Sequence, residues 1–253
     1  DCLLAGYLLN AGGTVSLSAL ALEYVSDADV SDIEGSSLLV QTLREKLLDK
    51  LREVAQEQKP GKTILDVFSR VEMPLIAILR AMERVGIRLN GSILTALSKE
   101  MEQEIESIQK EIYALAGREF NVSSPKQLSE VLFVELKIPT TNLKRTKTNV
   151  STASSELEKL KSEYPIVALV EQYRERTKLK NTYLDVLPRL VDAESRLHTT
   201  FGQATAATGR LSSTDPNLQN IPIRSEWGER IRSAFVASPG KLLVGADYSQ
   251  IEL

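Results

Sequence analysis

Seven residues at the end of the chain place two carboxylates where metal-assisted chemistry is possible. They are Asp247-Tyr248-Ser249-Gln250-Ile251-Glu252-Leu253. An unpaired carboxylate at the mouth of a buried strand is costly, so Asp247 needs a cation nearby. Mg²⁺ prefers oxygen ligands and is usually held by one or two carboxylates together with substrate phosphates. The alternative is a structural Asp247, in a salt bridge or a helix cap, and Glu252 is equally consistent with a solvated helix acid.

A second polar segment lies upstream and could contact a ligand through its backbone. Arg210 follows Gly209, and a glycine lets the chain approach a ligand closely. Asn217, Gln219 and Asn220 follow shortly afterwards. Together with the final heptapeptide, this spacing suggests a site for a metal, a sugar and a phosphate backbone. The alternative is that Asp215-Pro216-Asn217 is a simple polar turn.

Composition is that of an ordinary soluble protein with local basic stretches. The 253 residues suffice for one large domain or two to three small ones, with 42% hydrophobic and 26% charged residues. Aromatic residues make up 5%, which argues against an aromatic-rich binder of single strands. The net charge of −3 argues weakly against nucleic acid, but residues 142–150 and 174–180 are locally basic.

The single cysteine, Cys2, excludes an internal disulfide and fits a reducing cytoplasm. Residues 2–22 are uncharged, but polar residues and Gly12-Gly13 divide them, so we expect two buried helices rather than a membrane span. No basic segment precedes them, which argues against a signal peptide. Because the chain starts and stops inside structured sequence, we expect it to be a fragment of a longer protein.

The elements that must position these residues are mainly helices. Residues 1–70 contain helical pieces with a turn at 59–62, and a helix over 71–85 ends at Gly86. Apolar residues recur every three or four positions over 92–116, which predicts a helix capped by Ser92 and followed by Gly117. Its apolar face favours an intramolecular helix pair over a partner-helix interface.

Further helices are expected around an exposed basic tip, and strands are expected after residue 188. Ser124 caps a helix that ends before Pro139, residues 139–155 form the tip, and a helix runs over 166–185. Ser155 and Glu158 form a possible capping box. Strands are predicted over 197–204, 231–237 and 241–247, the last two joined by a turn at 238–240. The apolar run 242–246 indicates that the last strand is buried on both faces.

Several of these segments resemble DNA polymerase family A, the bacterial DNA polymerase I group. The resemblance is strong over residues 71–253 and weaker over 1–70. It is carried by the final heptapeptide and by the following segments: Thr208-Gly209-Arg210-Leu211-Ser212-Ser213, Asp215-Pro216-Asn217-Leu218-Gln219-Asn220-Ile221-Pro222, Val71-Glu72-Met73-Pro74-Leu75, Phe120-Asn121-Val122-Ser123-Ser124-Pro125-Lys126-Gln127-Leu128 and Lys178-Leu179-Lys180-Asn181-Thr182-Tyr183.

The resemblance implies a predominantly helical α+β fold, a fragment of the right-hand polymerase. Residues 1–70 would be a C-terminal remnant of a 3′–5′ exonuclease-like domain, inactive because Ala28 stands where its last motif needs Asp. Residues 71–187 would form the polymerase thumb and its connecting helices. Residues 188–253 would form the truncated N-terminal part of the palm, with part of its antiparallel sheet.

The resemblance also assigns roles to individual residues. Asp247 and the backbone carbonyl of Tyr248 would bind two Mg²⁺ ions, with Asp247 catalytic. Gln250 and Glu252 would contact the incoming nucleotide, where Glu252 leaves no room for a 2′-hydroxyl. Minor-groove acceptors are present in every base pair, so Arg, Asn and Gln can check pair geometry there. The DNA-binding set would be Lys144, Arg145, Lys147, Lys178, Lys180, Asn181, Thr208, Arg210, Asn217, Gln219, Asn220 and Arg224.

The implied function is DNA-directed DNA synthesis in replication and repair, by a monomer in the bacterial cytoplasm, at the nucleoid. Its partners would be primer–template DNA and deoxynucleoside triphosphates, with no membrane. The family's fingers helix and its His-Asp-Glu segment do not occur in this sequence, whose only histidine is His198. The chain by itself is therefore expected not to polymerise DNA. The alternatives are a non-catalytic duplex-DNA-binding module and a helical scaffold.

Overall fold

The computed structural model describes residues 1–13, 15–31, 36–145 and 149–249. Most of these residues are helical, and the strands are short and antiparallel, so the predicted helical α+β class is confirmed. The chain divides into two compact units. Unit 1 comprises residues 1–87 and 196–220, and unit 2 comprises 88–195 with the described part of 221–253. None of the described helices is both long and apolar enough to cross a membrane.

Unit 1 begins with the predicted helical pieces. They are α1 (Cys2–Leu9), α2 (Leu17–Tyr24), α3 (Ser37–Gln56), α4 (Ile64–Val67) and the π-helical turn η1 (Phe68–Glu72). Asp1, Ser16 and Ser36 cap the first three helices by accepting hydrogen bonds from backbone N–H groups. The core between the helices is built from leucines, among them Leu4, Leu20, Leu43, Leu47 and Leu51. The predicted pair of buried helices around Gly12-Gly13 is confirmed.

Helix α5 (Met73–Val85) ends at Gly86, as predicted. Gly86 has φ 59° and ψ −171°, a region that is almost restricted to glycine. A Cβ atom there would lie 2.6 Å from the Leu197 carbonyl oxygen and 2.8 Å from His198 Nδ1. Arg196 donates from Nη2 to the Gly86 carbonyl at 2.7 Å, and His198 Nδ1 lies 2.7 Å from the Glu83 carbonyl. The segment after residue 195 is thus fixed to the end of α5.

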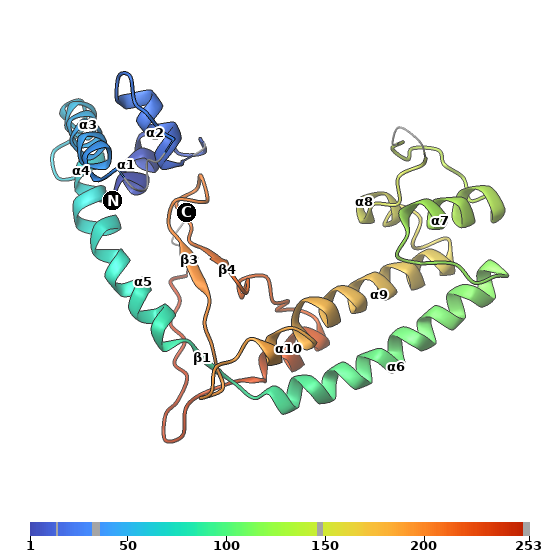
Figure 1. The fold of residues 1–253 in the computed structure, drawn as a ribbon. Coiled ribbons are helices and arrows are strands. Elements are labelled where there is room, and N and C mark those ends of the chain that lie inside the picture. The colour runs from blue at the N-terminus through green and yellow to red at the C-terminus, as the bar shows by residue number, and fades with distance from the viewer. Residues whose placement is uncertain (14, 32–35, 146–148, 250–253) are drawn as a thin grey trace. The chain divides into compact units, whose positions relative to one another are not determined.

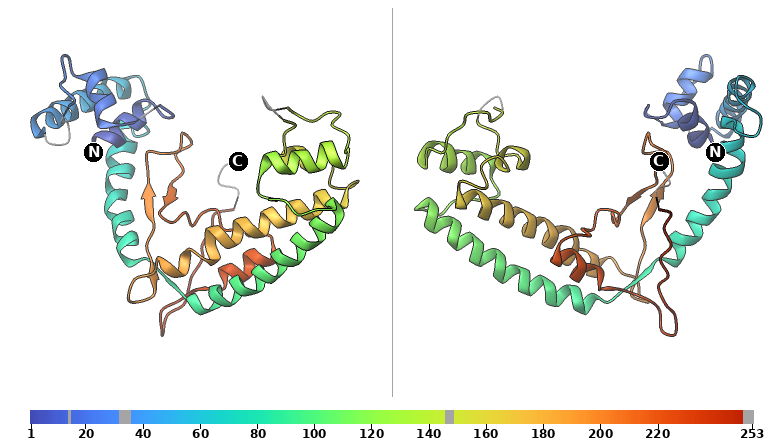
Figure 2. Two further views of the ribbon diagram at one scale, coloured as in Figure 1. Left: turned by 45° about the vertical axis from the view of Figure 1, so that its right-hand side comes forward. Right: turned by 180° about the vertical axis from the view of Figure 1, so that it is seen from behind.

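Unit 2 is organised by two helices that lie side by side, α6 (Gly91–Ala116) and α9 (Pro165–Leu179) (Figure 1). Figure 2 shows the same pairing from two other directions. The predicted stripe faces inward through Leu94, Leu97, Met101, Ile108 and Ile112, so the intramolecular interpretation is confirmed. Gly117 ends α6 in the left-handed conformation. The predicted cap is wrong, because Asn90 precedes the helix and accepts a hydrogen bond from Ser92 Oγ.

Shorter helices surround the basic tip of unit 2. They are α7 (Pro125–Ser129), the π-helical turn η2 (Glu130–Glu135), α8 (Ser154–Leu157), the π-helical turn η3 (Lys180–Leu184) and the 3₁₀ turn η4 (Leu187–Arg189). Ser124 caps α7 as predicted. The capping box at Ser155 and Glu158 is wrong, because α8 starts at Ser154 after Ala153, which makes no side-chain cap.

The strands depart most from the sequence prediction. Residues 197–204 form parts of β2 (Arg196–Leu197) and β3 (Thr200–Gly202), and β3 pairs with β4 (Ser212–Thr214). The strand predicted over 231–237 is wrong: α10 (Glu226–Arg232) occupies its start. Ser225 caps α10, with acids in its first turn and arginines in its last. Only β5 (Phe235–Val236) remains extended, and it pairs with β1 (Ile87–Leu89).

The predicted buried strand over 241–247 is also wrong. The turn at 238–240 is present, with a hydrogen bond from the Lys241 N–H to the Ser238 carbonyl. Beyond it, residues 241–248 have no regular secondary structure and join no sheet of the described residues. Leu242 and Val244 are therefore 88% and 89% exposed. An apolar run forms a buried strand only where neighbouring strands supply backbone partners and cover both faces.

Candidate nucleic-acid interface

In unit 1, the predicted DNA contacts lie on two adjoining segments, the connection between β3 and β4 and the turn that follows β4. Gln219 Nε2 donates to the carbonyl of Leu211, the residue after Arg210, at 3.0 Å. The Gln219 N–H also donates to Asn217 Oδ1 at 3.0 Å. These bonds bring the glycine–arginine segment and the amide segment together. Each predicted contact in this unit is exposed: Thr208, Arg210, Asn217, Gln219 and Asn220.

A buried hydroxyl fixes the base of this turn. Ser213 is 1% exposed, and its Oγ accepts a hydrogen bond from the Leu218 N–H at 3.1 Å. Thr199 Oγ1 lies 2.7 Å from Ser213 Oγ and donates to the Pro216 carbonyl at 2.9 Å. The backbone of 213–218 is thereby held from inside, and the polar side chains of the turn stay at the surface. This arrangement can present an arginine and several amides to a ligand without deep burial.

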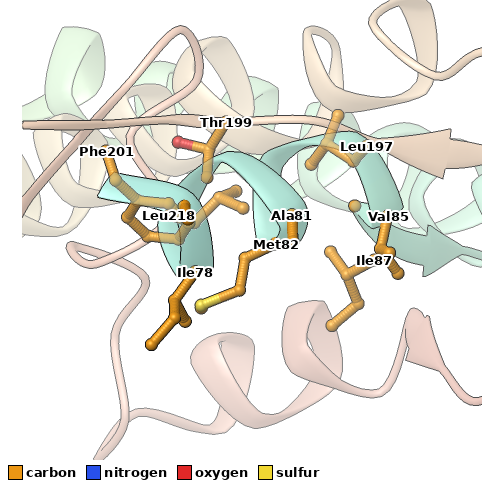
Figure 3. Close-up of a pocket in the computed structure, with 11 residues that line it drawn as sticks. Ile78, Ala81, Met82, Val85, Ile87, Leu197, Thr199, Phe201 and Leu218 are labelled. Atoms are coloured by element: carbon orange, nitrogen blue, oxygen red, sulfur yellow. The ribbon is translucent and has the colours of Figure 1, made fainter. Parts of the chain in front are cut away.

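Unit 1 also contains an apolar cavity of about 760 Å³ beside α5 (Figure 3). Apolar residues of α5, among them Ile78, Met82 and Val85, line it together with Leu197, Phe201 and Leu218. Thr199 alone among the lining residues has a polar side chain, and its hydroxyl is engaged by Ser213. A cavity of this kind offers few donors for phosphate and few oxygens for a cation. It holds none of the predicted site residues.

In unit 2, the basic tip presents its cations to solvent. Lys144 and Arg145 are exposed, and Arg145 forms an antiparallel bridge with Val150. Lys147, also predicted to bind DNA, lies outside the described residues. Arg224 is exposed immediately before the Ser225 cap of α10. These side chains are accessible to a polyanion.

The second basic segment of unit 2 is different, because acids surround its central lysine. Lys180 Nζ lies 2.6 Å from Glu102 Oε2 and 2.8 Å from Asp185 Oδ2, and its side chain is 15% exposed. Hydrogen bonds from Lys180 to Asp185 and Glu102 raise the pKa of the lysine. Burial alone would raise the pKa of Asp185, but bonds from Lys180 and Ser98 lower it. The two other predicted DNA contacts of this segment, Lys178 and Asn181, are exposed.

Neither acidic partner of Lys180 figured in the sequence prediction. Glu102 lies on α6, far from Lys180 in the sequence, so no local pattern links the two residues. Two further ion pairs join α6 to other elements: Arg176 with Glu104 at 2.7 Å, and Arg230 with Glu100. In the sequence, the spacing of the acids along α6 is consistent with a solvated face. The structure is needed to show which of these acids form ion pairs.

The final motif is described only in part. Asp247 and Tyr248 are exposed, and Gln250 and Glu252 lie outside the described residues. Across residues 1–13, 15–31, 36–145 and 149–249, no group of three His, Cys, Asp or Glu side chains is arranged to hold a metal ion. Asp247 can therefore offer one carboxylate to Mg²⁺, but this part of the chain does not form a complete metal site by itself.

Comparisons with known proteins agree with the resemblance seen in the sequence. The model of a family described as DNA polymerase family A matches residues 91–253. Thermostable DNA polymerase I of Thermus filiformis is 46% identical over 254 residues, covering 100% of this chain and 29% of the relative. DNA polymerase I of Bacillus subtilis is 39% identical over 277 residues, covering 100% and 30%. The chain thus spans less than a third of these relatives.

A solved structure matches the whole chain as well. It is described as the POL domain of Pol1 from M. smegmatis in complex with DNA primer-template and dNTP. The TM-score is 0.85 with 37% sequence identity, and the match covers 100% of this chain and 44% of that chain.

Proposed function

This chain belongs to DNA polymerase family A, and we propose that the complete protein is a DNA-directed DNA polymerase. It extends the 3′-hydroxyl of a primer with deoxynucleoside triphosphates on a DNA template, in replication and repair. It acts as a monomer at the bacterial nucleoid. The observation that carries the proposal is the match of the whole chain to a polymerase domain in complex with primer-template and dNTP, at 37% identity.

The exposed residues of both units have the chemistry that this substrate requires. Arg210, Asn217 and Gln219 can donate to minor-groove acceptors that every base pair shares, so they would test geometry rather than sequence. Lys144 and Arg145 would neutralise backbone phosphates. The role of Lys180 as a direct phosphate contact is the weakest part of the predicted set, because its ammonium group is already paired with two carboxylates.

Asp247, with the carbonyl of Tyr248, is proposed as one contributor to the binding of two Mg²⁺ ions. In phosphoryl transfer such ions stabilise the attacking and leaving oxygens. Residues of the complete protein beyond those described must supply the remaining ligands. Gln250 and Glu252 are proposed to contact the incoming nucleotide. Glu252 would exclude a ribose by filling the space of its 2′-hydroxyl.

The proposal is tested by replacing Asp247 with Ala in the complete protein. Primer extension is expected to fall by at least about a thousandfold, because one ligand of both ions is lost. Affinity for primer–template DNA should change little. The matched control is Asp49→Ala, which removes an exposed carboxylate whose ion-pair partner among the described residues is Arg52 and should leave extension intact. Retained extension in Asp247→Ala would refute the assignment of this residue.

For the 253-residue chain itself, a second function is favoured by one observation. Its described residues present exposed cations and amides in both units, but they form no metal site. The chain alone would then bind duplex DNA without performing chemistry. Fluorescence anisotropy across a salt series, paired with a primer-extension assay, would separate the two functions: salt-dependent binding without extension describes a binding module.

A further inference from the structure

Glu156 is a buried acid next to the basic tip, and neither the sequence motifs nor the proposed function uses it. The residue lies in the first turn of α8 and is 2% exposed. Removing a carboxylate from water is costly unless hydrogen bonds and an opposite charge compensate. Bonds to this carboxylate from Lys159 and then from the Lys144 backbone hold the pKa of Glu156 below its ordinary value. It is therefore ionised at neutral pH.

The partners of Glu156 connect it to the backbone of the tip. Glu156 Oε2 accepts a hydrogen bond from the Lys144 N–H at 3.0 Å and from Lys159 Nζ at 2.7 Å. Lys159 Nζ also donates to the Asn142 carbonyl at 3.0 Å. The acid and its lysine thus bind the chain on both sides of Leu143. The Lys144 side chain forms no hydrogen bond or ion pair with either of them in the contacts described. After the bonds from Lys159 and from the Lys144 N–H, the charge of the Lys144 side chain contributes a smaller lowering of the pKa of Glu156.

The other side of the tip is anchored to different elements. The Ser151 N–H donates to the Lys144 carbonyl at 2.9 Å. Ser129 Oγ, at the end of α7, donates to the Val150 carbonyl at 3.1 Å. Arg174 of α9 donates to the Thr152 carbonyl. The backbone around Lys144 and Arg145 is consequently fixed from three helices, while their side chains remain exposed.

We propose that Glu156 is a positioning residue that orders the backbone at Lys144 so that Lys144 and Arg145 meet a DNA phosphate backbone in a preset arrangement. The proposal rests on the proposed function of the tip. Its physical basis is that contacts made by an ordered segment cost less conformational entropy on binding. A carboxylate paired with the Lys144 ammonium group would instead compete with phosphate for that cation and weaken DNA binding.

Electrostatics and positioning predict opposite changes in DNA affinity when Glu156 is replaced. From electrostatics alone, removing a negative charge near the tip strengthens DNA binding. Positioning says that Glu156→Gln and Glu156→Asp both weaken it, by about fivefold, because preorganisation is lost. Glu156→Asp is the stricter variant, since it keeps the charge and shortens the reach to the Lys144 N–H. The matched controls are Glu158→Gln and Glu158→Asp, two residues on, where the side chain is 64% exposed and paired with Lys161.

Affinity is measured on the complete protein with a fluorescein-labelled primer–template duplex at fixed salt. The Glu158 controls should bind with native or slightly higher affinity. A double-mutant cycle then separates positioning from general destabilisation. In the Lys144→Ala/Arg145→Ala background, Glu156→Asp should cause no further loss, because the groups that it positions are gone. A loss of the same size in that background would overturn the inference.

Native DNA affinity in both Glu156 variants overturns the inference but does not contradict a DNA contact by the tip. Native affinity in Lys144→Ala/Arg145→Ala overturns both the inference and that contact. Hydrogen exchange in the native protein needs no variant: the Lys144 amide should be protected by its bond to the carboxylate, and rapid exchange there would also overturn the inference.

Discussion

Two basic segments of unit 2 meet acidic residues in opposite ways. At the tip, Glu156 binds the backbone N–H of Lys144, and the lysine side chain stays exposed. At the end of α9, Glu102 and Asp185 bind the ammonium group of Lys180, whose side chain is 15% exposed. An acid beside a basic segment can therefore bind the backbone and leave the cationic side chain exposed, or it can form an ion pair with that side chain. Counting charges along the sequence does not distinguish these two cases.

The largest expected difference between the two segments is in the salt dependence of DNA binding. Lys144→Ala/Arg145→Ala should lower the slope of log affinity against log salt by about two, at roughly 0.9 per phosphate contact. Lys180→Ala should leave the slope almost unchanged, because that ammonium group already has two carboxylate partners. Anisotropy titrations at several salt concentrations measure both slopes. A drop of about one unit in Lys180→Ala would break the comparison.

The next effect is on stability. Lys180→Ala leaves Glu102 and Asp185 without their shared partner and should lower the free energy of unfolding by about 1–3 kcal/mol. Lys178→Ala is the matched control, because Lys178 is exposed in the last turn of α9, two residues before Lys180. Its effect should stay within about 0.5 kcal/mol. Urea unfolding measures both. Equal stability of the two variants would show that the ion pairs of Lys180 contribute little.

The smallest effect is a pH dependence at the tip. The folded-state pKa of Glu156 is lowered from its ordinary value of 4.5, so its carboxylate stabilises the fold above about that pH. This stabilisation is lost as the pH falls through the lowered pKa, where protonated glutamate resembles glutamine. The difference in melting temperature between native protein and Glu156→Gln should be full at pH 7 and shrink under acid conditions. A difference that is constant with pH would contradict this assignment.

The helices of this fold were largely predictable from sequence because their signals are local. The period of Leu94, Leu97 and Met101 and the glycine at 117 define α6 without reference to any other element. The run over 242–246 has an equally clear apolar pattern but needs partner strands, and the described chain provides none. α10 was not predicted, because its last turn overlaps the strand predicted over 231–237. The helix is favoured by the Ser225 cap, by acids in its first turn and by arginines in its last turn.

The candidate site was predictable only to the level of residue types. The exposed positions of Arg210 and Asn217 agree with the sequence interpretation, although their binding roles stay predictions. The hydrogen bond that joins Gln219 to Leu211 spans eight residues and follows no sequence rule. Glu156 belongs to no sequence motif, because the hydrogen bond that distinguishes it comes from a backbone N–H twelve residues away. The division of the chain into exonuclease-like, thumb and palm parts also stays a prediction.

Gly86 is a position at which the backbone should accept no other amino acid. Gly61 and Gly240 also have positive φ angles, but a Cβ atom at either would meet open space. In a saturation-mutagenesis library, those two positions should admit asparagine, which tolerates the left-handed region. At position 86 only glycine should be recovered from the library, because both its dihedral angles and the nearby Leu197 carbonyl exclude a side chain. A laboratory selection on this protein should therefore find no substitute for Gly86 at the end of α5.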